Sequence, residues 1–153
     1  MNHTIRPAVA GDAETIADMN VRMARETEGL ALDPPTVVEG VAAVLADRSK
    51  GHYLVAEAAG RVVGCLMVTH EWSDWRNGDL WWIQSVYVEP DHRGRGAFRS
   101  LYEATRQQAL EEGASGLRLY VEHENHTAQQ TYGKLGMSKT HYHIMEEMLT
   151  SNG

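Results

Sequence analysis

The chain has 153 residues, of which 42% are hydrophobic, so it has the length of one domain and can bury a core of its own. Its formal net charge of −7 argues against non-specific nucleic-acid binding, which requires a basic surface. No apolar run approaches the roughly eighteen residues of a membrane helix, and the first residues lack the basic and apolar regions of a signal peptide. We therefore expect one cytoplasmic domain over residues 1–153, without nucleic-acid or membrane partners.

The first third of the chain predicts one short strand and two helices. Residues 4–8 favour a strand, and Asp12 is placed to cap a helix that ends near Gly29. A second helix begins after Asp33, which is followed by two prolines, because an N-cap residue and a proline in the first turn are typical helix starts. Its apolar residues recur at helical spacing as far as Ala46.

Three strands are expected next. Residues 51–57 and 61–70 predict an antiparallel hairpin around a turn at Gly60, and residues 80–88 predict a third strand. An Asn-Gly pair at residues 77–78 marks the turn before that third strand, which is apolar on both faces, as a central strand should be. Cys65 lies inside the second of these runs and is expected to be a buried, unreactive side chain.

The last third of the chain predicts two helices and two strands. A helix with one apolar face ends at Gly113, and residues 117–122 favour a strand. A short helix over residues 128–135 follows Asn125, and residues 142–149 favour a final strand. No repeat or linker interrupts the chain, so the sequence predicts a single domain.

The segment from Gln84 to Leu101 is the first candidate site. It passes from a strand through a proline turn into Arg93-Gly94-Arg95-Gly96 and then directly into a helix. Glycines let the backbone approach a ligand, and the free N–H groups of a helix start favour an anion. We expect a pyrophosphate there, although a short glycine loop can also be a plain strand-to-helix connection with exposed arginines.

A second motif lies about thirty residues downstream of this glycine loop. It places Asn125 before a short helix, Ala128 in its first turn and Tyr132 one turn later, followed by Gly136. In this order and spacing the two motifs resemble the GNAT superfamily of acyl-CoA-dependent N-acyltransferases, and the resemblance in element order covers nearly the whole chain. It implies an α/β fold with a mixed, mostly antiparallel sheet, in the order strand, two helices, three strands, helix, strand, helix and two closing strands. It also implies a splay between the strands at 80–88 and 117–122.

The resemblance implies acetyl-CoA as the co-substrate and no metal. The glycine loop would bind the pyrophosphate, and the backbone of the preceding strand would bind the pantetheine arm and the acyl carbonyl. The implied cofactor-binding residues are Val86, Tyr87, Val88, Arg93, Gly94, Arg95, Gly96, Ala97, Phe98, Arg99, Asn125 and Ala128. Phe98 stands where the family usually has a small residue, but a side chain at a helix start can face the core and leave the amides available.

Tyr132 is implied as the general acid. An amine attacks the thioester, and the departing thiolate is better released with a proton, which a phenol with a pKa of about 10 can supply. The alternative is that Tyr132 only packs its helix. Many family members have a glutamate four residues before the position of Val88, whereas this chain has Gln84, which cannot accept a proton. Glu122, Glu71 and a water held by Gln84 therefore remain open as the base.

The acceptor side is expected near the end of the first helix and around the long hairpin. Carboxylates beside aromatic faces suit a protonated amine. The predicted substrate-binding residues are Glu28, Glu71, Trp72, Trp75 and Gln84, with Glu26, Asp74 and Trp81 nearby. The alternatives are that these tryptophans belong to a core or a dimer interface and that the glutamates belong to a solvated helix surface.

The sequence thus predicts direct transfer of an acetyl group to a primary amine of a small molecule that is polyamine-like, an amino acid or another aminated compound. Two alternatives stay open: a non-catalytic acyl-CoA-binding sensor or interaction module, which Gln84 favours, and an acetyltransferase for protein N-termini or lysines. A homodimer is expected from the resemblance. Four histidines between residues 123 and 143 invite a metal site, but no carboxylate or cysteine lies at ligand spacing, so no metal is expected.

Overall fold

The computed structural model describes residues 3–150, which fall into two compact units divided between Tyr120 and Val121. The structure defines the arrangement within each unit. The single domain expected over residues 1–153 stays a prediction. Across residues 3–150, no helix combines the length and the apolar character needed to span a bilayer.

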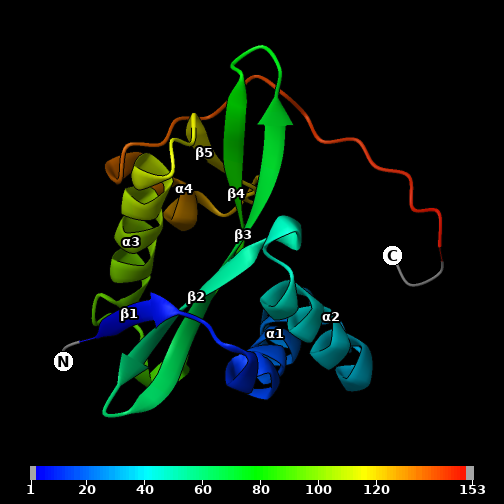
Figure 1. Cartoon of the computed structure of the whole chain (residues 1–153), viewed down its shortest axis with the longest axis vertical. Coiled ribbons are helices and arrows are strands. Elements are labelled where there is room, and N and C mark those ends of the chain that lie inside the picture. The colour runs from blue at the N-terminus through cyan, green and yellow to red at the C-terminus, as the bar shows by residue number, and fades with distance from the viewer. Residues whose placement is uncertain (1–2, 151–153) are drawn as a thin grey trace. The chain divides into compact units, whose positions relative to one another are not determined.

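The first unit is built on one mixed sheet of five strands in the spatial order β1-β2-β3-β4-β5 (Figure 1). β1 to β4 pair as antiparallel neighbours, and β5 pairs in parallel with β4. The strands are β1 (Thr4–Pro7), β2 (His52–Ala58), β3 (Arg61–Ser73), β4 (Gly78–Val88) and β5 (Gly116–Leu119). This arrangement confirms the mixed, mostly antiparallel sheet of the predicted α/β class.

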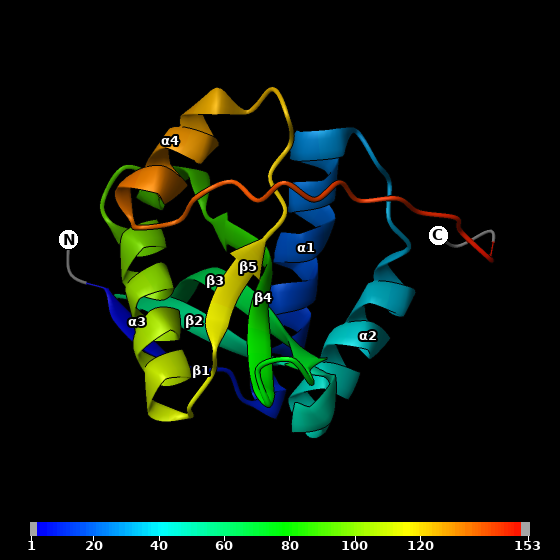
Figure 2. The same cartoon turned by 90° about the horizontal axis from the view of Figure 1, so that it is seen from above.

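Three helices cover this sheet, with α1 (Ala13–Glu28) and α2 (Pro34–Ala46) on one face and α3 (Ala97–Glu111) on the other (Figure 2). α1 ends at Gly29, whose φ of 64° is the left-handed conformation that closes many helices. α2 begins at Asp33, whose carboxylate accepts a hydrogen bond from the backbone N–H of Thr36. Three single-turn 3-10 helices complete the unit at Ala10–Asp12, Arg48–Lys50 and Pro90–His92. These helix ends lie close to where the sequence predicts them. Asp12 stands at the N-cap of α1 as predicted, but its carboxylate makes no capping hydrogen bond to that helix and accepts from Arg6 and the Val9 N–H instead.

The core between the sheet and the first two helices is apolar and closely packed. Its buried members are Ile16, Ala17, Met19, Val41, Tyr53, Val55, Cys65 and Tyr87. Burial raises the pKa of the Cys65 thiol to about 12, which keeps it protonated and unreactive at neutral pH. The prediction of a buried cysteine is confirmed.

β4 changes its pairing halfway along its length. In the ladder with β3, Met67 pairs with Ser85 and Val68 pairs with Ile83, so Gln84 is an extra, bulged residue. β5 pairs with β4 only from Leu80 to Ile83, and within the described part of the chain the second half of β4 has no strand beside it on that edge. Because β5 itself ends at Leu119, where this pairing stops, the predicted splay between the two strands stays a prediction.

The second unit contains one helix and no strand within its described residues, 121–150. α4 (His126–Lys134) follows Asn125, whose side-chain oxygen accepts a hydrogen bond from the Ala128 N–H at 3.1 Å, as its predicted capping role requires. The two closing strands, including the one expected over residues 142–149, are not formed. A strand requires hydrogen bonds to a neighbouring strand, which the apolar residues of one segment do not supply. The large apolar side chains of this segment are exposed: Tyr142, Ile144, Met145, Met148 and Leu149.

Candidate active site

The glycine loop leads from β4 into α3 and leaves the start of that helix open. Gly94 and Gly96 have φ values of 76° and 88°, a conformation that favours glycine. No side chain caps the N-terminus of α3, so the first-turn N–H groups are not used by a cap. A Cβ atom added to either glycine would meet nothing within 4 Å, which shows that space adjoins the loop. This geometry suits an anion.

The side chains that follow the loop divide between core and surface. Ala97 is buried and Phe98 is half-buried, so the departure from the family pattern at Phe98 leaves the loop conformation intact. Arg99 lies on the exposed face of α3, where its Nε donates to Glu103 at 2.8 Å. Arg99 can therefore contribute its positive charge to the predicted anion site only if its side chain leaves the ion pair with Glu103.

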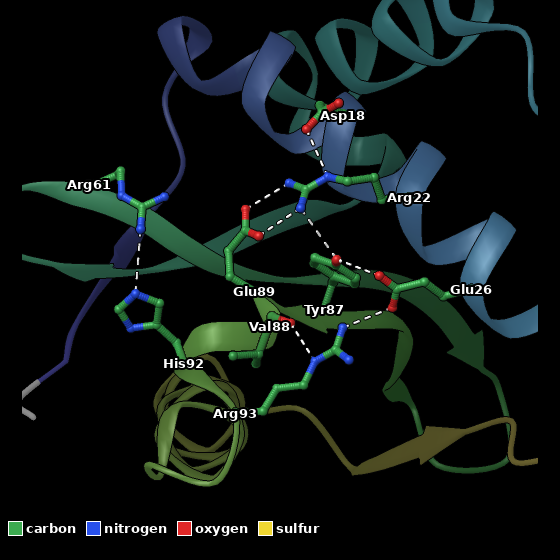
Figure 3. A network of polar contacts seen from close by, with 9 residues as sticks. All are labelled: Asp18, Arg22, Glu26, Arg61, Tyr87, Val88, Glu89, His92 and Arg93. Atoms are coloured by element: carbon green, nitrogen blue, oxygen red, sulfur yellow. Dashed lines mark hydrogen bonds and ion pairs between the residues drawn. The ribbon is translucent and has the colours of Figure 1, made fainter.

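Arg93 is fixed by two contacts at the end of β4 (Figure 3). Its Nε donates to the Val88 carbonyl at 2.8 Å, and its Nη2 donates to Glu26 Oε2 at 2.9 Å. The other oxygen of Glu26 accepts from the Tyr87 hydroxyl at 3.1 Å. The hydrogen bond from Arg93 holds the pKa of Glu26 below its usual value, with a smaller contribution from Tyr87. Glu26 is thus bound to Arg93, the first residue of the glycine loop, and its expected place near the acceptor stays a prediction.

A second ion pair joins α1 to the same strand end. Both guanidinium Nη atoms of Arg22 donate to Glu89 at 2.7 Å, and its Nε donates to Asp18 at 3.0 Å (Figure 3). The hydrogen bonds from Arg22 lower the pKa of Glu89. Arg22 and Arg93 also lie over the Tyr87 ring, 5.4 and 5.3 Å from its centre. Sequence reasoning missed this network because Arg22 and Glu89 are 67 residues apart and nothing local marks them as partners.

A pocket of about 460 Å³ lies between α1, the α1–α2 connection, α2 and the bulge of β4; we call it the α1–β4 pocket. Its polar lining residues are Asn20, Thr27, Glu28, Gln84 and Ser85. Its apolar lining residues are Met23, Ala24, Leu30, Leu32 and Val37. Two predicted substrate-binding residues, Glu28 and Gln84, thus line one pocket, which borders β4 where its pairing with β5 stops.

The other predicted acceptor residues lie elsewhere in the first unit. Glu71 accepts hydrogen bonds from Trp82 Nε1 at 2.8 Å and from Arg118 Nη1 at 3.4 Å. Trp72 lines a separate cavity of about 440 Å³ on the long hairpin, and Trp75 is 90% exposed at its turn. These three residues are not among those lining the α1–β4 pocket, and their roles stay predictions.

Gln84 has a defined orientation at the bulge. Its Nε2 donates to Thr69 Oγ1 at 2.7 Å. This bond orients the side-chain amide, whose oxygen can only accept hydrogen bonds. A water or an ammonium group can donate to that oxygen. The arrangement suits positioning of a nitrogen nucleophile, and it supplies no proton acceptor of the strength of a carboxylate.

Four of the predicted catalytic and cofactor residues belong to the second unit. Tyr132 and Ala128 lie on α4, one turn apart. The Glu122 backbone carbonyl accepts from the Asn125 N–H at 3.0 Å and from the Gln129 side chain at 3.0 Å, which fixes the chain before the helix. The roles of Tyr132, Glu122, Asn125 and Ala128 stay predictions. Among residues 3–150, no group of three or more histidine, cysteine, aspartate or glutamate side chains is arranged to hold a metal ion.

Comparisons with known proteins agree with this arrangement. The model of the Acetyltransferase (GNAT) family matches residues 21–137, a span that contains both sequence motifs. The crystal structure of a possible acetyltransferase from Clostridium difficile 630 has 42% identity, a TM-score of 0.91 and coverage of 98% of this chain and 99% of that one.

Two curated relatives extend the comparison. A bovine (Bos taurus) protein, thialysine N-epsilon-acetyltransferase, is 33% identical over 93 residues, which are 56% of this chain and 54% of the relative. The uncharacterized N-acetyltransferase YhfO of Bacillus subtilis (strain 168) is 26% identical over 132 residues, which are 77% of this chain and 89% of that protein. The match therefore spans about half of the bovine relative and most of the bacterial one.

Proposed function

Because the chain belongs to the acetyltransferase (GNAT) family and is an acyltransferase, we propose that it transfers the acetyl group of acetyl-CoA to a primary amine of a small molecule. The observation that carries this proposal is the α1–β4 pocket. It brings Glu28 and Gln84 together beside the β4 bulge, and the same strand leads into the glycine loop. A strand that links an amine-sized pocket to an anion-binding loop can serve both substrates of a transfer.

The cofactor half of the proposed site is the end of β4 and the start of α3. The amides at Gly94, Gly96 and the first turn of α3 bind the pyrophosphate, with the helix dipole favouring its charge. The unpaired edge of β4 beyond Ile83 offers backbone groups to the pantetheine arm. When bound, acetyl-CoA supplies the thioester; the chain supplies its alignment with the amine.

The proposed reaction is a direct transfer. The neutral amine nitrogen attacks the thioester carbonyl and forms a C–N bond, and the tetrahedral intermediate then collapses with cleavage of the C–S bond. The nitrogen loses a proton to water or a base, and the Tyr132 phenol gives its proton to the departing thiolate. No covalent enzyme intermediate is formed.

Loss of the amine proton is assigned to water ordered at Gln84. An ammonium group with a pKa of about 10 is neutral only to about one part in a thousand at pH 7, so deprotonation must be assisted. Glu71 is not among the residues lining the α1–β4 pocket, and its two oxygens already accept from Trp82 and Arg118. The Gln84 amide oxygen can orient a water that carries the proton to solvent, and Glu122 is the remaining carboxylate candidate.

The test is thiol release from acetyl-CoA over a panel of primary amines, with short peptides included to represent protein acceptors. We expect turnover with at least one small amine. Tyr132→Phe should leave acetyl-CoA binding unchanged and lower kcat by about two to four orders of magnitude, the usual contribution of a general acid. Unchanged kcat would remove Tyr132 as the acid.

The second candidate function is a non-catalytic acyl-CoA-binding module, which the glutamine at the bulge favours. It predicts acetyl-CoA binding without thiol release for every amine and peptide tested, and Gln84→Glu would then be the variant to assay for gained turnover. Homodimer formation and a cytoplasmic location are part of the proposal as expectations; light scattering of the purified chain tests the first.

A further inference from the structure

We infer that the α1–β4 pocket selects an amine with one positive charge and an apolar body, such as a linear or aromatic alkylamine, over polyamines and aminoglycosides. This inference rests on the proposed function and narrows its acceptor class. Three features of the pocket support this inference: its single carboxylate, its apolar surface, and the hydrogen bonds that its neutral polar groups already make.

The first feature is a single carboxylate. Glu28 is the only ionisable residue that lines the pocket among those described, and it lies in the last turn of α1, where the helix dipole also favours a cation. Glu26, two residues earlier, is bound by Arg93 and Tyr87 and does not line the pocket. The pocket can therefore pair one ammonium group, and a second would enter without a partner, which is unfavourable.

The second feature is an apolar wall that the protein leaves partly open. Leu30 and Leu32 lie in the α1–α2 connection and are 51% and 37% exposed, and Met23 and Val37 line the pocket beside them. An apolar substrate body would remove this surface from water, which stabilises the complex in proportion to the area buried. A hydrated polycation gains little from such a wall.

The third feature is that three of the four neutral polar lining residues already donate hydrogen bonds within the protein, the exception being Ser85. Asn20 Nδ2 donates to the Tyr53 hydroxyl at 3.1 Å, and Thr27 Oγ1 donates to the Met23 carbonyl at 2.8 Å. Gln84 Nε2 donates to Thr69, as described above. These bonds use one N–H of each amide and the hydroxyl hydrogen of Thr27, so fewer donors remain for the many hydroxyl groups of a sugar than those groups find in water. A polyhydroxylated acceptor would therefore lose hydrogen bonds on entry.

The size of the pocket agrees with this class of acceptor. A volume of about 460 Å³ is in the lower part of the range of small-molecule sites, which is roughly 300–1,000 Å³. An alkylamine or arylalkylamine with its ammonium at Glu28 and its body on Leu30 and Leu32 fits that volume.

The test compares amines matched in length: hexylamine against 1,6-diaminohexane, with phenethylamine, spermidine and kanamycin as further members. We expect kcat/KM for hexylamine to exceed that for the diamine by about tenfold or more, because the second ammonium meets the apolar wall. Leu32→Asp places a second carboxylate in that wall and should reduce or reverse the preference. Equal or higher kcat/KM for the diamine or for kanamycin with the unmodified protein would overturn the inference.

Glu28→Gln tests the charge itself. We expect a rise in KM for hexylamine with little change in KM for acetyl-CoA, whereas the matched control Glu14→Gln, exposed in the first turn of the same helix, should change neither. An unchanged amine KM in Glu28→Gln would contradict the assigned role.

The two levels of the proposal fail differently. Turnover of polycations alone would leave the proposed function standing and refute the inference. If no amine is acetylated although acetyl-CoA binds, the proposed function fails. Calorimetric titration of hexylamine and 1,6-diaminohexane into the CoA-loaded protein then decides the inference: tighter binding of hexylamine supports it, and equal or weaker binding overturns it.

Discussion

Glu26 joins the last turn of α1 to the end of β4 and the glycine loop. One of its oxygens accepts from Arg93 and the other from Tyr87, while Arg93 also donates to the Val88 carbonyl (Figure 3). The helix that lines the α1–β4 pocket is thereby tied to the residue that begins the glycine loop. A side chain on this link should affect acetyl-CoA binding through the position of Arg93.

Replacement of Glu26 by glutamine tests this link. Glutamine keeps the shape but loses the charge, so Arg93 loses an ion pair in which both side chains are partly exposed. Exposed pairs of this kind contribute modestly and are screened by salt, so we expect KM for acetyl-CoA to rise about two- to fivefold at low salt, with a smaller difference at high salt. Steady-state kinetics with acetyl-CoA as the varied substrate measures the change.

The control for Glu26→Gln is Glu112→Gln. Glu112 forms an ion pair of similar exposure with Arg48 at the opposite end of α3 from the glycine loop, and its loss should leave the KM for acetyl-CoA unchanged. Equal KM values for Glu26→Gln and the unmodified protein would show that Glu26 does not hold Arg93 in the binding geometry.

At the scale of elements, the glycine loop makes the sharpest prediction. Gly96 has a φ of 88°, so a valine at this position is strained by roughly 1–2 kcal/mol, and its side chain enters the open space beside the helix start. We expect Gly96→Val to weaken acetyl-CoA binding by about tenfold or more, because both the loop and its N–H groups move. Isothermal titration measures the affinity.

Gly40→Ala provides the matched glycine control. Gly40 lies within α2, its added Cβ meets nothing within 4 Å, and alanine in a helix is more stable than glycine by about 0.5–1 kcal/mol. This variant should unfold at a slightly higher temperature and bind acetyl-CoA normally. If Gly96→Val binds acetyl-CoA as tightly as Gly40→Ala, the loop is not the pyrophosphate site.

The sequence predicts these elements where their signals are local. Gly29 ends α1 and Asp33 begins α2, and each residue acts on the helix that it directly adjoins. The glycines after Arg93 likewise mark the loop in which they lie. The bulge at Gln84 has no such signal, because it arises from the register between β3 and β4. The strand predicted over residues 142–149 is not formed, since pairing partners cannot be read from one segment.

The same distinction applies to the candidate site. Glu28 and Gln84 were predicted on the acceptor side, and the fold brings them to one pocket. The ion pair of Arg22 with Glu89 could not be predicted, because only the packing of α1 against the sheet places its two members together. Contacts between distant segments are therefore the part of the site that needed the structure.

At the scale of the whole molecule, stability should depend on pH through a pair of histidines in the first unit. His52 is 8% exposed, its ring stacks on His70 with 5.4 Å between centres, and it meets the edge of Trp81 at 4.9 Å. Its Nε2 donates to Gln108 Oε1 at 2.9 Å, while its Nδ1 is buried with no hydrogen-bond partner among the described residues. The folded protein therefore holds His52 in its neutral form.

Charges around the pair act in both directions. The pKa of His52 is lowered to about 4, chiefly by burial and then by nearby Arg48 and His70, while Gln108 and Glu112 oppose the shift. Burial and then Arg48 also lower the pKa of His70, with Asp79 and Glu112 opposing. Both histidines thus bind protons less readily in the folded protein than in the unfolded chain, where the pKa is about 6.5.

This difference sets the direction of the pH dependence. Between about pH 6.5 and 4 the unfolded chain binds a proton at His52 that the folded protein does not, so the free energy of unfolding falls as the pH falls through this range. The full effect is roughly 3 kcal/mol, of which about half should be lost by pH 5.

Urea unfolding at about pH 7.5, 6.5 and 5, followed by tryptophan fluorescence, measures this change in the free energy of unfolding. The variant His52→Gln should show a weaker fall of the free energy of unfolding with falling pH. The control His141→Gln, at an exposed position in the second unit, should show the same fall as the unmodified protein. An equal slope of unfolding free energy against pH in both variants and the unmodified protein would show that His52 does not titrate as its burial requires.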